Sequence, residues 1–571
     1  MRHHAGHTHA QALAQAMAAV CLSLALSGHT LAATVKCSDT IDPAAPVLSN
    51  GFGLNPRNTR NQASDIRASN VATLQLAYTH VAEGSIEKKS VPAVTRQVLY
   101  FSEGRDVVAA NRSSGCEYWR FSAIDKSTLL VGSNAIRSSS IFHLPAQAPS
   151  QEQPLRAPMV YAGDFYGNYY GLDAVTGRKV WQAFMGTDAS RHYISGSPQA
   201  HAGVLYIPVA TKEVITTVLD IFSACCKTHG LLRAVNAYTG EFKWTYHATP
   251  EAVLDKTARF RGPSGVSIWS TPTIDTQRQQ ILITTAQNLS PPVTHNSDAV
   301  VAIDLNSGRE KWAFQAVSDD VWNASCSAPN GLNSHCVAAP GQDLDIGAPP
   351  VLADLPGGGQ TVLAGCKNGV VYALNPDTGA LRWQRRVGAG GGLGGIHWGL
   401  ALDRNKVYAA VSDLSVNKLA RLSIGQIFTA QLSTDARMAS VPNATPGIYA
   451  LDLLTGDVRW QRSFQHTYEG QPQLSRFSAA LSVTNDVLLA GSLDGRVYAL
   501  STQDGQTLWS HNTAVATVDV NGVAGQGGTI DQGGPIPVGR DVYVNSGYSS
   551  FGETNAFLGG HGNALFVFRL P

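Results

Sequence analysis

A short motif that contains glycine and tryptophan recurs seven times and constrains the fold more than any other feature of the chain. Each copy has an alternating apolar segment, a turn of the type Asp/Asn-x-x-Thr/Ser/Asp-Gly (Ser501 opens the last one), and a tryptophan four residues after the glycine. The tryptophans are Trp119, Trp181, Trp244, Trp312, Trp383, Trp460 and Trp509. Asp or Asn can bond its own turn backbone, and glycine accepts a positive φ. The motif therefore predicts a β-hairpin whose returning strand directs a tryptophan at the neighbouring sheet.

Successive tryptophans are 49 to 77 residues apart, which is enough each time for one four-stranded sheet with its loops. This spacing predicts an all-β fold, a β-propeller of four-stranded antiparallel blades. The two ends of the chain supply an eighth blade, because residues 541–546 and 564–569 can pair with residues 74–80 and close the ring. The alternative is an open solenoid of stacked sheets. Helices are expected to be few and confined to insertions such as residues 417–429.

The composition agrees with such a fold and gives no sign of a nucleic-acid partner or a membrane span. The chain has 55 glycines, 27 prolines and only 15% charged residues, which suits many tight turns and short strands. A net charge of +1 and the absence of a basic run give no indication of nucleic acid as a partner. No segment of the mature chain has the roughly 20 apolar residues that a membrane span needs.

The N-terminus has the features of an export signal. Arg2 precedes an apolar stretch over residues 16–26, and small residues follow near Ala32 and Ala33, where we expect cleavage. The predicted division is therefore a signal peptide at 1–33 and one propeller domain at 34–571, located in the periplasm. The alternatives are an uncleaved anchor helix and a lipoprotein cysteine at Cys21.

Seven cysteines follow Cys21, and an oxidising compartment would let several of them pair. Cys326 and Cys336 enclose a short loop, which predicts a local disulfide, and Cys37 with Cys116 is a second expected pair. Cys366 is then left as a buried free thiol. The sequence has no Cys-x-x-Cys-His, so it is not expected to carry covalently attached haem c.

Several Gly-rich segments give the chain a resemblance to a known family. They are residues 51–61 (GFGLNPRNTRN), 347–350 (GAPP), 391–399 (GGLGGIHWG), 527–531 (GGTID) and 543–548 (YVNSGY). Together they resemble the pyrroloquinoline-quinone (PQQ) dependent alcohol dehydrogenases, most closely the branch that contains polyvinyl alcohol dehydrogenase. The resemblance covers nearly the whole mature chain and implies PQQ and Ca²⁺ as cofactors.

The resemblance also implies a calcium site and a catalytic base. Glu213 lies 18 residues after Ser195, at the spacing that separates the family's calcium-binding Glu from its Ile-Thr-Gly motif. Asn288 ends the segment that corresponds to the one holding the family's amide ligand, so the resemblance implies Asn288 as a second calcium ligand. Asp320 opens Asp-Val-Trp-Asn, where relatives have Asp-x-Trp-Asp with the first Asp as base and ligand. Gln287 is a rival for Asn288, and Asp319 is a rival for Asp320.

Seven further positions are implied to bind PQQ. In this family a ring formed by adjacent cysteines lies against one face of the quinone and a tryptophan against the other, and Cys225, Cys226 and Trp269 match that set. Two unpaired thiols are the alternative at the cysteines. Matches to other cofactor contacts are Ser195, Lys367, His397 and Trp398. Here His397 replaces the family's Asn, and an exposed turn lysine is the alternative at Lys367.

These residues predict a quinoprotein that oxidises an alcohol, either a secondary alcohol or a hydroxylated polymer, and passes electrons to a separate cytochrome c. A non-catalytic propeller that binds proteins in the cell envelope is a second hypothesis. Sugar oxidation is a third.

Overall fold

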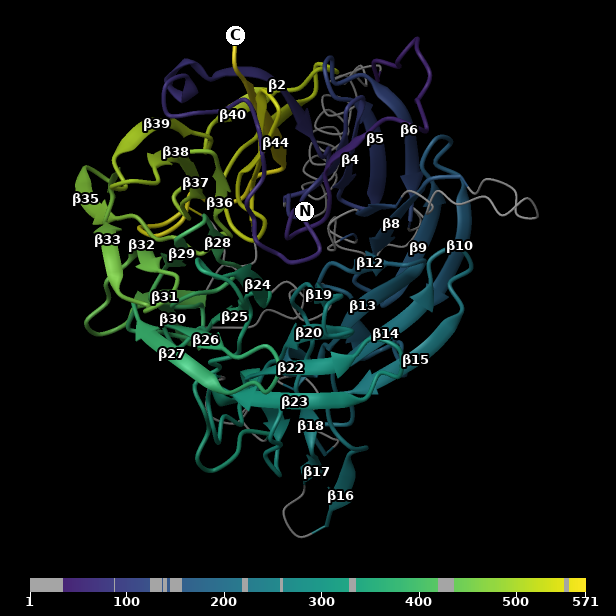
Figure 1. The fold of residues 1–571 in the computed structure, drawn as a ribbon, viewed down its shortest axis with the longest axis vertical. Coiled ribbons are helices and arrows are strands. Elements are labelled where there is room, and N and C mark those ends of the chain that lie inside the picture. The colour runs from purple at the N-terminus through teal and green to yellow at the C-terminus, as the bar shows by residue number, and fades with distance from the viewer. Residues whose placement is uncertain are drawn as a thin grey trace, which may run out of the picture.

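The computed structural model describes residues 34–86, 88–123, 136, 141–143, 157–217, 224–256, 260–327, 335–419, 436–548 and 554–571. In this part of the chain, eight antiparallel sheets stand around a common centre as the blades of a propeller (Figure 1). Six sheets have four strands and two have five, so the predicted all-β, eight-bladed fold is confirmed. The predicted signal at residues 1–33 lies outside the described residues.

The blades follow one another along the chain. The first and second contain β1 (Val47–Ser49), β3 (Ala93–Thr95), β4 (Val98–Glu103), β5 (Asp106–Asn111) and β6 (Glu117–Ser122), then β7 (Ile141–His143), β8 (Met159–Gly163), β9 (Asn168–Asp173) and β10 (Lys179–Phe184). The third and fourth contain β11 (His192–Tyr193), β12 (Gln199–His201), β13 (Val204–Thr211), β14 (Leu231–Asn236) and β15 (Phe242–His247), then β19 (Thr273–Asp275), β20 (Gln280–Thr284), β22 (Ala299–Asp304) and β23 (Glu310–Gln315). The fifth and sixth contain β24 (Val351–Asp354), β25 (Gln360–Gly365), β26 (Val370–Leu374) and β27 (Leu381–Arg386), then β28 (Ala401–Leu402), β29 (Lys406–Val411), β32 (Gly447–Asp452) and β33 (Val458–Arg462). The seventh and eighth contain β36 (Ser482–Thr484), β37 (Val487–Gly491), β38 (Arg496–Ser501) and β39 (Thr507–Asn512), then β42 (Ile536–Val538), β43 (Asp541–Ser546), β44 (Ala564–Arg569) and β2 (Gln75–Val81).

Two-stranded sheets and short helices complete the described part. The two-stranded sheets are β16 (Val253–Asp255) with β17 (Phe260–Gly262), β18 (Ser264–Gly265) with β21 (Asn288–Ser290), β30 (Leu414–Leu419) with β31 (Ala436–Ser440), β34 (Gln465–Tyr468) with β35 (Gln471–Leu474), and β40 (Ala516–Val518) with β41 (Ala524–Gln526). The helical segments are η1 (Val71–Thr73), α2 (Glu213–Thr216) and η2 (Ala324–Ser327). The helix predicted at 417–429 is wrong at its start, because residues 417–419 belong to β30, whose backbone groups pair with β31. Residues 420–429 lie outside the described part.

The recurrent tryptophan and glycine act together across neighbouring blades. A Cβ added to Gly379 of the fifth blade would lie 2.5 Å from the ring of Trp312 in the fourth, and Gly379 has a φ of +73°. The indole N–H of Trp312 also donates to the backbone oxygen of Pro376 in the same turn, at 3.2 Å. Corresponding pairs are Gly177 with Trp119, Gly240 with Trp181, Gly308 with Trp244, Gly456 with Trp383 and Gly505 with Trp460. Each turn glycine therefore gives space to the tryptophan of the preceding blade.

Strands from the two ends of the chain close the ring. Strand β2 pairs with β44, so the purple N-terminal and yellow C-terminal segments lie side by side in Figure 1. At the next blade boundary, the ring of Tyr78 lies where a Cβ on Gly115 would be 3.2 Å away, and its hydroxyl donates to the oxygen of Arg112 at 2.8 Å. Tyr78 thus replaces the tryptophan in the eighth blade, and the predicted closure is confirmed.

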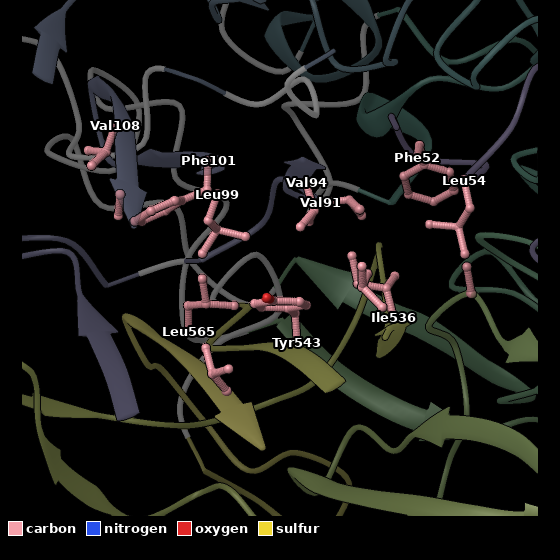
Figure 2. Packing of buried hydrophobic residues seen from close by; sticks show 14 of the residues in the cluster. Phe52, Leu54, Val91, Val94, Leu99, Phe101, Val108, Ile536, Tyr543 and Leu565 are labelled. Atoms are coloured by element: carbon pink, nitrogen blue, oxygen red, sulfur yellow. The ribbon is translucent and has the colours of Figure 1, made fainter. Parts of the chain in front are cut away.

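The segment 51–62 crosses the centre of the ring and ties the blades together. Its side chains donate to backbone carbonyls of five consecutive blades: Asn58 to Thr271 and Pro272, Arg57 to Leu352, Asn61 to Leu402, Arg60 to Leu481 and Gly533, and Gln62 to Pro537. Phe52 and Leu54 of this segment are buried in one hydrophobic cluster with Trp398 and Tyr543, part of which Figure 2 shows. We call residues 51–62 the central segment.

Three disulfides link the described cysteines. Cys37 pairs with Cys116, Cys326 with Cys336, and Cys225 with its neighbour Cys226. Cys366 is free and buried. All four predictions for the cysteines are therefore confirmed.

Candidate functional site

Asp320 follows β23 and is held by the backbone of a later loop. One carboxylate oxygen accepts from the N–H of Gln342 at 3.0 Å and the other from that of Leu344 at 2.8 Å. The residue is 2% exposed, whereas its neighbour Asp319 is exposed and has a φ of +60°. Burial raises the pKa of Asp320, as does the charge of Asp345, while the backbone N–H groups oppose the rise. Of the two adjacent carboxylates, only Asp320 lies in the interior.

Lys367 forms a buried ion cluster with two aspartates that the sequence did not single out. Its ammonium nitrogen lies 2.7 Å from Asp345 Oδ1 and 3.3 Å from Asp343 Oδ2. Asp345 Oδ2 also accepts from the indole N–H of Trp269 at 2.8 Å. The two carboxylates outweigh the effect of burial and raise the pKa of Lys367, so it remains charged. The alternative of an exposed turn lysine is therefore wrong, since the Lys367 side chain is 7% exposed.

Asp298 adds a fourth carboxylate to this region. It is fully buried, and neither of its oxygens has a hydrogen-bond partner among the described residues. Burial, together with the charges of Asp320, Asp345 and Asp343, raises the pKa of Asp298 well above its usual range. An unpaired buried carboxylate is costly unless it is protonated or contacts a cation.

The side-chain amides of Asn288 and Gln287 differ in whether the amide oxygen has a hydrogen-bond partner. Asn288 donates to the oxygen of Ser264 and accepts from the N–H of Thr294, so its amide holds the local turn. Gln287 donates to Asp343 Oδ1 at 3.1 Å, and its amide oxygen is buried without a partner in the described part of the chain. The backbone N–H of Asn288 donates to the backbone oxygen of Asp320 at 3.2 Å, which places Asn288 next to Asp320.

Glu213 begins the short helix α2 and is engaged by the chain that follows the cysteine pair. Its carboxylate accepts from the N–H groups of Lys227 and Thr228 at 2.7 to 3.0 Å, and it pairs with Arg191 Nε at 3.2 Å. Cys225 and Cys226 pack against Leu289 and, from the same helix, Val214. Glu213, the cysteine pair and the Asn288 strand therefore form one neighbourhood.

Aromatic side chains form the other neighbourhood. The ring centroid of Trp269 lies 5.1 Å from that of Trp398 and 5.8 Å from that of His397, and Lys367 Nζ is 5.8 Å from the Trp269 ring. Burial lowers the pKa of His397 well below its usual range, so the imidazole is neutral. His397 Nδ1 is 2.9 Å from the hydroxyl of Ser478.

The structure thus brings the predicted residues into two adjoining groups. One contains Glu213, Cys225, Cys226 and Asn288, and the other contains Asp320, Lys367, Trp269, His397 and Trp398. Ser195 is half-buried and adjoins the second group, because a Cβ on Gly196 would lie 2.8 Å from the backbone oxygen of Trp269. Asp298, Asp343 and Asp345 were not predicted from the sequence. The signal for Asp343 and Asp345 was the Asp-x-Asp that precedes the segment 347–350, whereas Asp298 had no sequence signal.

The donors at this site fit the implied cofactors. Buried polar atoms nearly always have partners, so the unpaired oxygens of Gln287 and Asp298 indicate room for a polar or cationic ligand. A set of carboxylate and amide oxygens is suited to a hard cation such as Ca²⁺. The tryptophans and the charged Lys367 are suited to a flat, anionic aromatic group.

Similar solved structures include dehydrogenases of the quinoprotein class. The quinohemoprotein alcohol dehydrogenase from Comamonas testosteroni aligns over 92% of this chain and 80% of its own, with 19% identity and a TM-score of 0.63. A europium-containing methanol dehydrogenase aligns over 93% of this chain and 98% of its own, with 16% identity and a TM-score of 0.60. These likenesses establish the fold.

The sequence comparisons place the chain more closely. Residues 52–335 match the family described as "Glucose/ethanol/alcohol dehydrogenase, beta-propeller domain", and residues 368–561 match one described as "Outer membrane protein assembly factor BamB". Polyvinylalcohol dehydrogenase from a Pseudomonas species is 32% identical over 94% of this chain and 79% of its own length. The enzyme of that name from Sphingopyxis sp. (strain 113P3) is 30% identical with the same coverage. The chain belongs to the PQQ-dependent alcohol dehydrogenase family, as its motifs predicted.

Proposed function

We propose that this protein oxidises a secondary or polymeric alcohol in the periplasm, with PQQ and Ca²⁺ bound at the site described above. The observation that carries the proposal is the buried Asp320 beside the unpaired oxygen of Gln287 and the Lys367 ion cluster. The two polyvinylalcohol dehydrogenases that span most of the chain support a hydroxylated polymer as substrate.

The calcium ligands are Glu213, Asp320 and an amide oxygen from the Gln287–Asn288 pair. All four side chains are buried, and carboxylate and amide oxygens are the donors that Ca²⁺ prefers. Asn288 Oδ1 already accepts from Thr294, so Gln287 Oε1 is the amide oxygen that binds with less rearrangement. Glu213 would have to exchange its contact with Arg191 for one with the cation.

PQQ is held between the Cys225–Cys226 ring and Trp269, with Ser195, Lys367, His397 and Trp398 around it. Bound PQQ would supply a two-electron acceptor, and Ca²⁺ would supply a Lewis acid beside it. Lys367 contributes a fixed positive charge because Asp343 and Asp345 keep it protonated. Neutral His397 offers a hydrogen bond without adding a second charge.

Asp320 takes the proton of the substrate hydroxyl onto a carboxylate oxygen as the carbinol hydrogen leaves with its electron pair. Two backbone N–H groups hold that carboxylate in one orientation, which favours proton transfer along a fixed direction. Phe52 and Leu54 of the central segment help to exclude water from the site, since they pack in the buried cluster that contains Trp398.

The electrons leave to a separate acceptor, for which a soluble cytochrome c is the proposed partner. The sequence contains no Cys-x-x-Cys-His for a covalent haem of its own. Three disulfides agree with an oxidising compartment. Among the described residues, no helix is both long and apolar enough to cross a lipid bilayer.

The test is a titration of the purified protein with PQQ, with and without Ca²⁺, followed by dye reduction with a panel of small and polymeric alcohols. Asp320→Asn should retain PQQ but lose at least about 100-fold in kcat, since general base catalysis contributes about 10² to 10⁴. Asp319→Asn is the matched control, because the carboxylate of Asp319 is exposed, and this variant should keep wild-type activity. Absence of Ca²⁺-dependent PQQ binding would refute the proposal and favour a protein-binding propeller. Activity with sugars alone would refute the substrate class.

A further inference from the structure

Two histidines and a glutamate meet outside the site described above, at the base of the β16–β17 hairpin. His229 Nε2 lies 2.8 Å from His247 Nδ1, at the end of β15. The ligand atoms of His229, His247 and Glu251 all lie within 4.8 Å of one another. The hairpin that begins at Val253, two residues after Glu251, projects from the ring in Figure 1.

The three side chains combine a fixed ligand with two accessible ones. His229 is 4% exposed, and its second ring nitrogen has no hydrogen-bond partner among the described residues. Burial lowers the pKa of His229 to about 4, so the ring is neutral and can donate a lone pair. His247 and Glu251 are exposed, and a metal ion can therefore reach them from solvent.

We propose that His229, His247 and Glu251 form a second metal site that binds a divalent transition-metal ion such as Zn²⁺. Two imidazole nitrogens and one carboxylate suit Zn²⁺, Ni²⁺ or Cu²⁺, whereas Ca²⁺ prefers oxygen ligands alone. With three protein ligands, water completes a tetrahedral set. The two metal sites of the chain therefore have different selectivity.

Small movements of the three side chains bring their ligand atoms to the spacing of a tetrahedral Zn²⁺ site. Zn–N and Zn–O bonds of about 2.0 to 2.2 Å place tetrahedral ligand atoms about 3.3 Å apart. The His229 and His247 nitrogens need to separate by only about 0.5 Å from their present hydrogen bond. Glu251 follows Pro250 in an exposed connection before β16, where its side chain can turn toward the histidines.

The position connects this site to the cofactor site through the backbone. Thr228 precedes His229 and donates to Glu213 Oε2 through both its N–H and its hydroxyl, at 2.7 and 2.6 Å. His229 also bridges to Gly265 at the start of the segment that leads to Trp269. A metal ion on His229 therefore restrains the chain that holds Glu213, and we expect Zn²⁺ to raise the thermal unfolding temperature.

The test uses the full chain saturated with Ca²⁺ and free of PQQ, so that failure of the dehydrogenase proposal does not affect it. Zn²⁺ is titrated by calorimetry, and Co²⁺ is titrated to follow the visible bands of a tetrahedral site. His247→Ala and Glu251→Gln should each weaken the Zn²⁺ site about tenfold or more, since even outer-sphere partners contribute 10- to 100-fold. His295→Ala is the matched control, because His295 is an exposed histidine paired with Glu310 at 2.8 Å.

The expected result is one Zn²⁺ site that both variants weaken and the control leaves intact, with the rise in unfolding temperature lost in parallel. Histidines at positions 3, 4, 7 and 9 are present in every variant, so their binding cancels in the comparison. Equal Zn²⁺ affinity in the wild type, His247→Ala and Glu251→Gln would overturn the proposal. A loss of the same size in His295→Ala would do so as well, because binding would then be unspecific.

Discussion

Lys367 Nζ lies 2.7 Å from Asp345 Oδ1, and this buried contact places a fixed positive charge beside Trp269. Removing the lysine leaves Asp343 and Asp345 without their cation. Breaking one side of a buried ion pair costs about 3 to 5 kcal/mol. Lys367→Met is therefore expected to lower the free energy of unfolding by that amount and to abolish PQQ binding, measured by urea unfolding and by quinone absorbance.

Lys406→Met is the matched control for this change. Lys406 lies 2.9 Å from Asp403, but both side chains are partly exposed, and such pairs contribute about 1 kcal/mol or less. Lys367→Arg should restore stability because it keeps the charge. Equal stability of Lys367→Met and the wild type would contradict the assigned ion cluster.

The ion cluster also shows what the sequence could not reveal. The resemblance to the family implies Lys367 as a cofactor contact, but the partners of Lys367 come from a loop more than twenty residues earlier that has no periodic pattern. Asp298 was missed for the same reason, since its burial depends on the packing of several blades. The repeat could be predicted from the sequence because its signal lies within one turn, namely a glycine and a tryptophan four residues later.

Gly379 tests whether the turn glycine gives space to the tryptophan of the preceding blade. Alanine at this position must adopt a φ of +73° and place its Cβ 2.5 Å from the Trp312 ring. A left-handed conformation costs about 1 to 2 kcal/mol, and overpacking adds about 1 to 3. Gly379→Ala is therefore expected to destabilise the protein by about 2 to 5 kcal/mol in chemical unfolding.

Gly357→Ala separates the two costs. Gly357 has a φ of +91°, but a Cβ there meets nothing within 4 Å, so only the conformational cost remains. It should be the milder change. If both variants lose the same stability, the tryptophan does not occupy the space that the glycine leaves.

Asp531 gives the protein a pH-dependent stability. Burial raises the pKa of Asp531 to about 6, while an unfolded chain has an Asp pKa near 3.8. Between these values the native state binds more protons than the unfolded state, so stability falls as pH rises from about 4 to about 6. The loss is on the order of 3 kcal/mol at neutral pH.

Asp531→Asn removes that titration. The wild type should be more stable relative to this variant at pH 4 than at pH 7, with the change centred between these values, in urea unfolding of the PQQ-free protein. Asp504→Asn is the control at an exposed turn: the N–H of Gln506 lowers the pKa of that carboxyl, so the wild type should not gain stability relative to this variant at pH 4. A difference between wild type and Asp531→Asn that stays constant with pH would contradict the raised pKa.

The central segment marks another limit of the sequence. Residues 51–61 were recognised as a motif, but the partners of Arg60 lie more than 400 residues away at Leu481 and Gly533. Only closure of the ring brings these groups to one point. The role of the segment as a central tie therefore follows from the three-dimensional structure.

Arg60 is 1% exposed, and its guanidinium donates to the backbone oxygens of Phe52, Leu481 and Gly533. Arg60→Ala leaves three buried carbonyls without donors, at about 1 to 3 kcal/mol each. We therefore expect a loss of at least about 3 kcal/mol in the free energy of unfolding. Because Phe52 packs in the cluster with Trp398 and Trp269, PQQ affinity should fall as well.

Arg57→Ala is the matched control within the same segment. Arg57 is partly exposed and donates to Leu352 and Asp354 in β24 of the fifth blade, so its loss should cost about 1 kcal/mol or less and leave PQQ affinity unchanged. Arg60→Lys should recover part of the stability, since one ammonium group can reach some of the carbonyls but cannot match the planar fork of the guanidinium. If Arg60→Ala and Arg57→Ala lose equal stability, the centre of the ring is held by the blades alone, and the central segment only fills space.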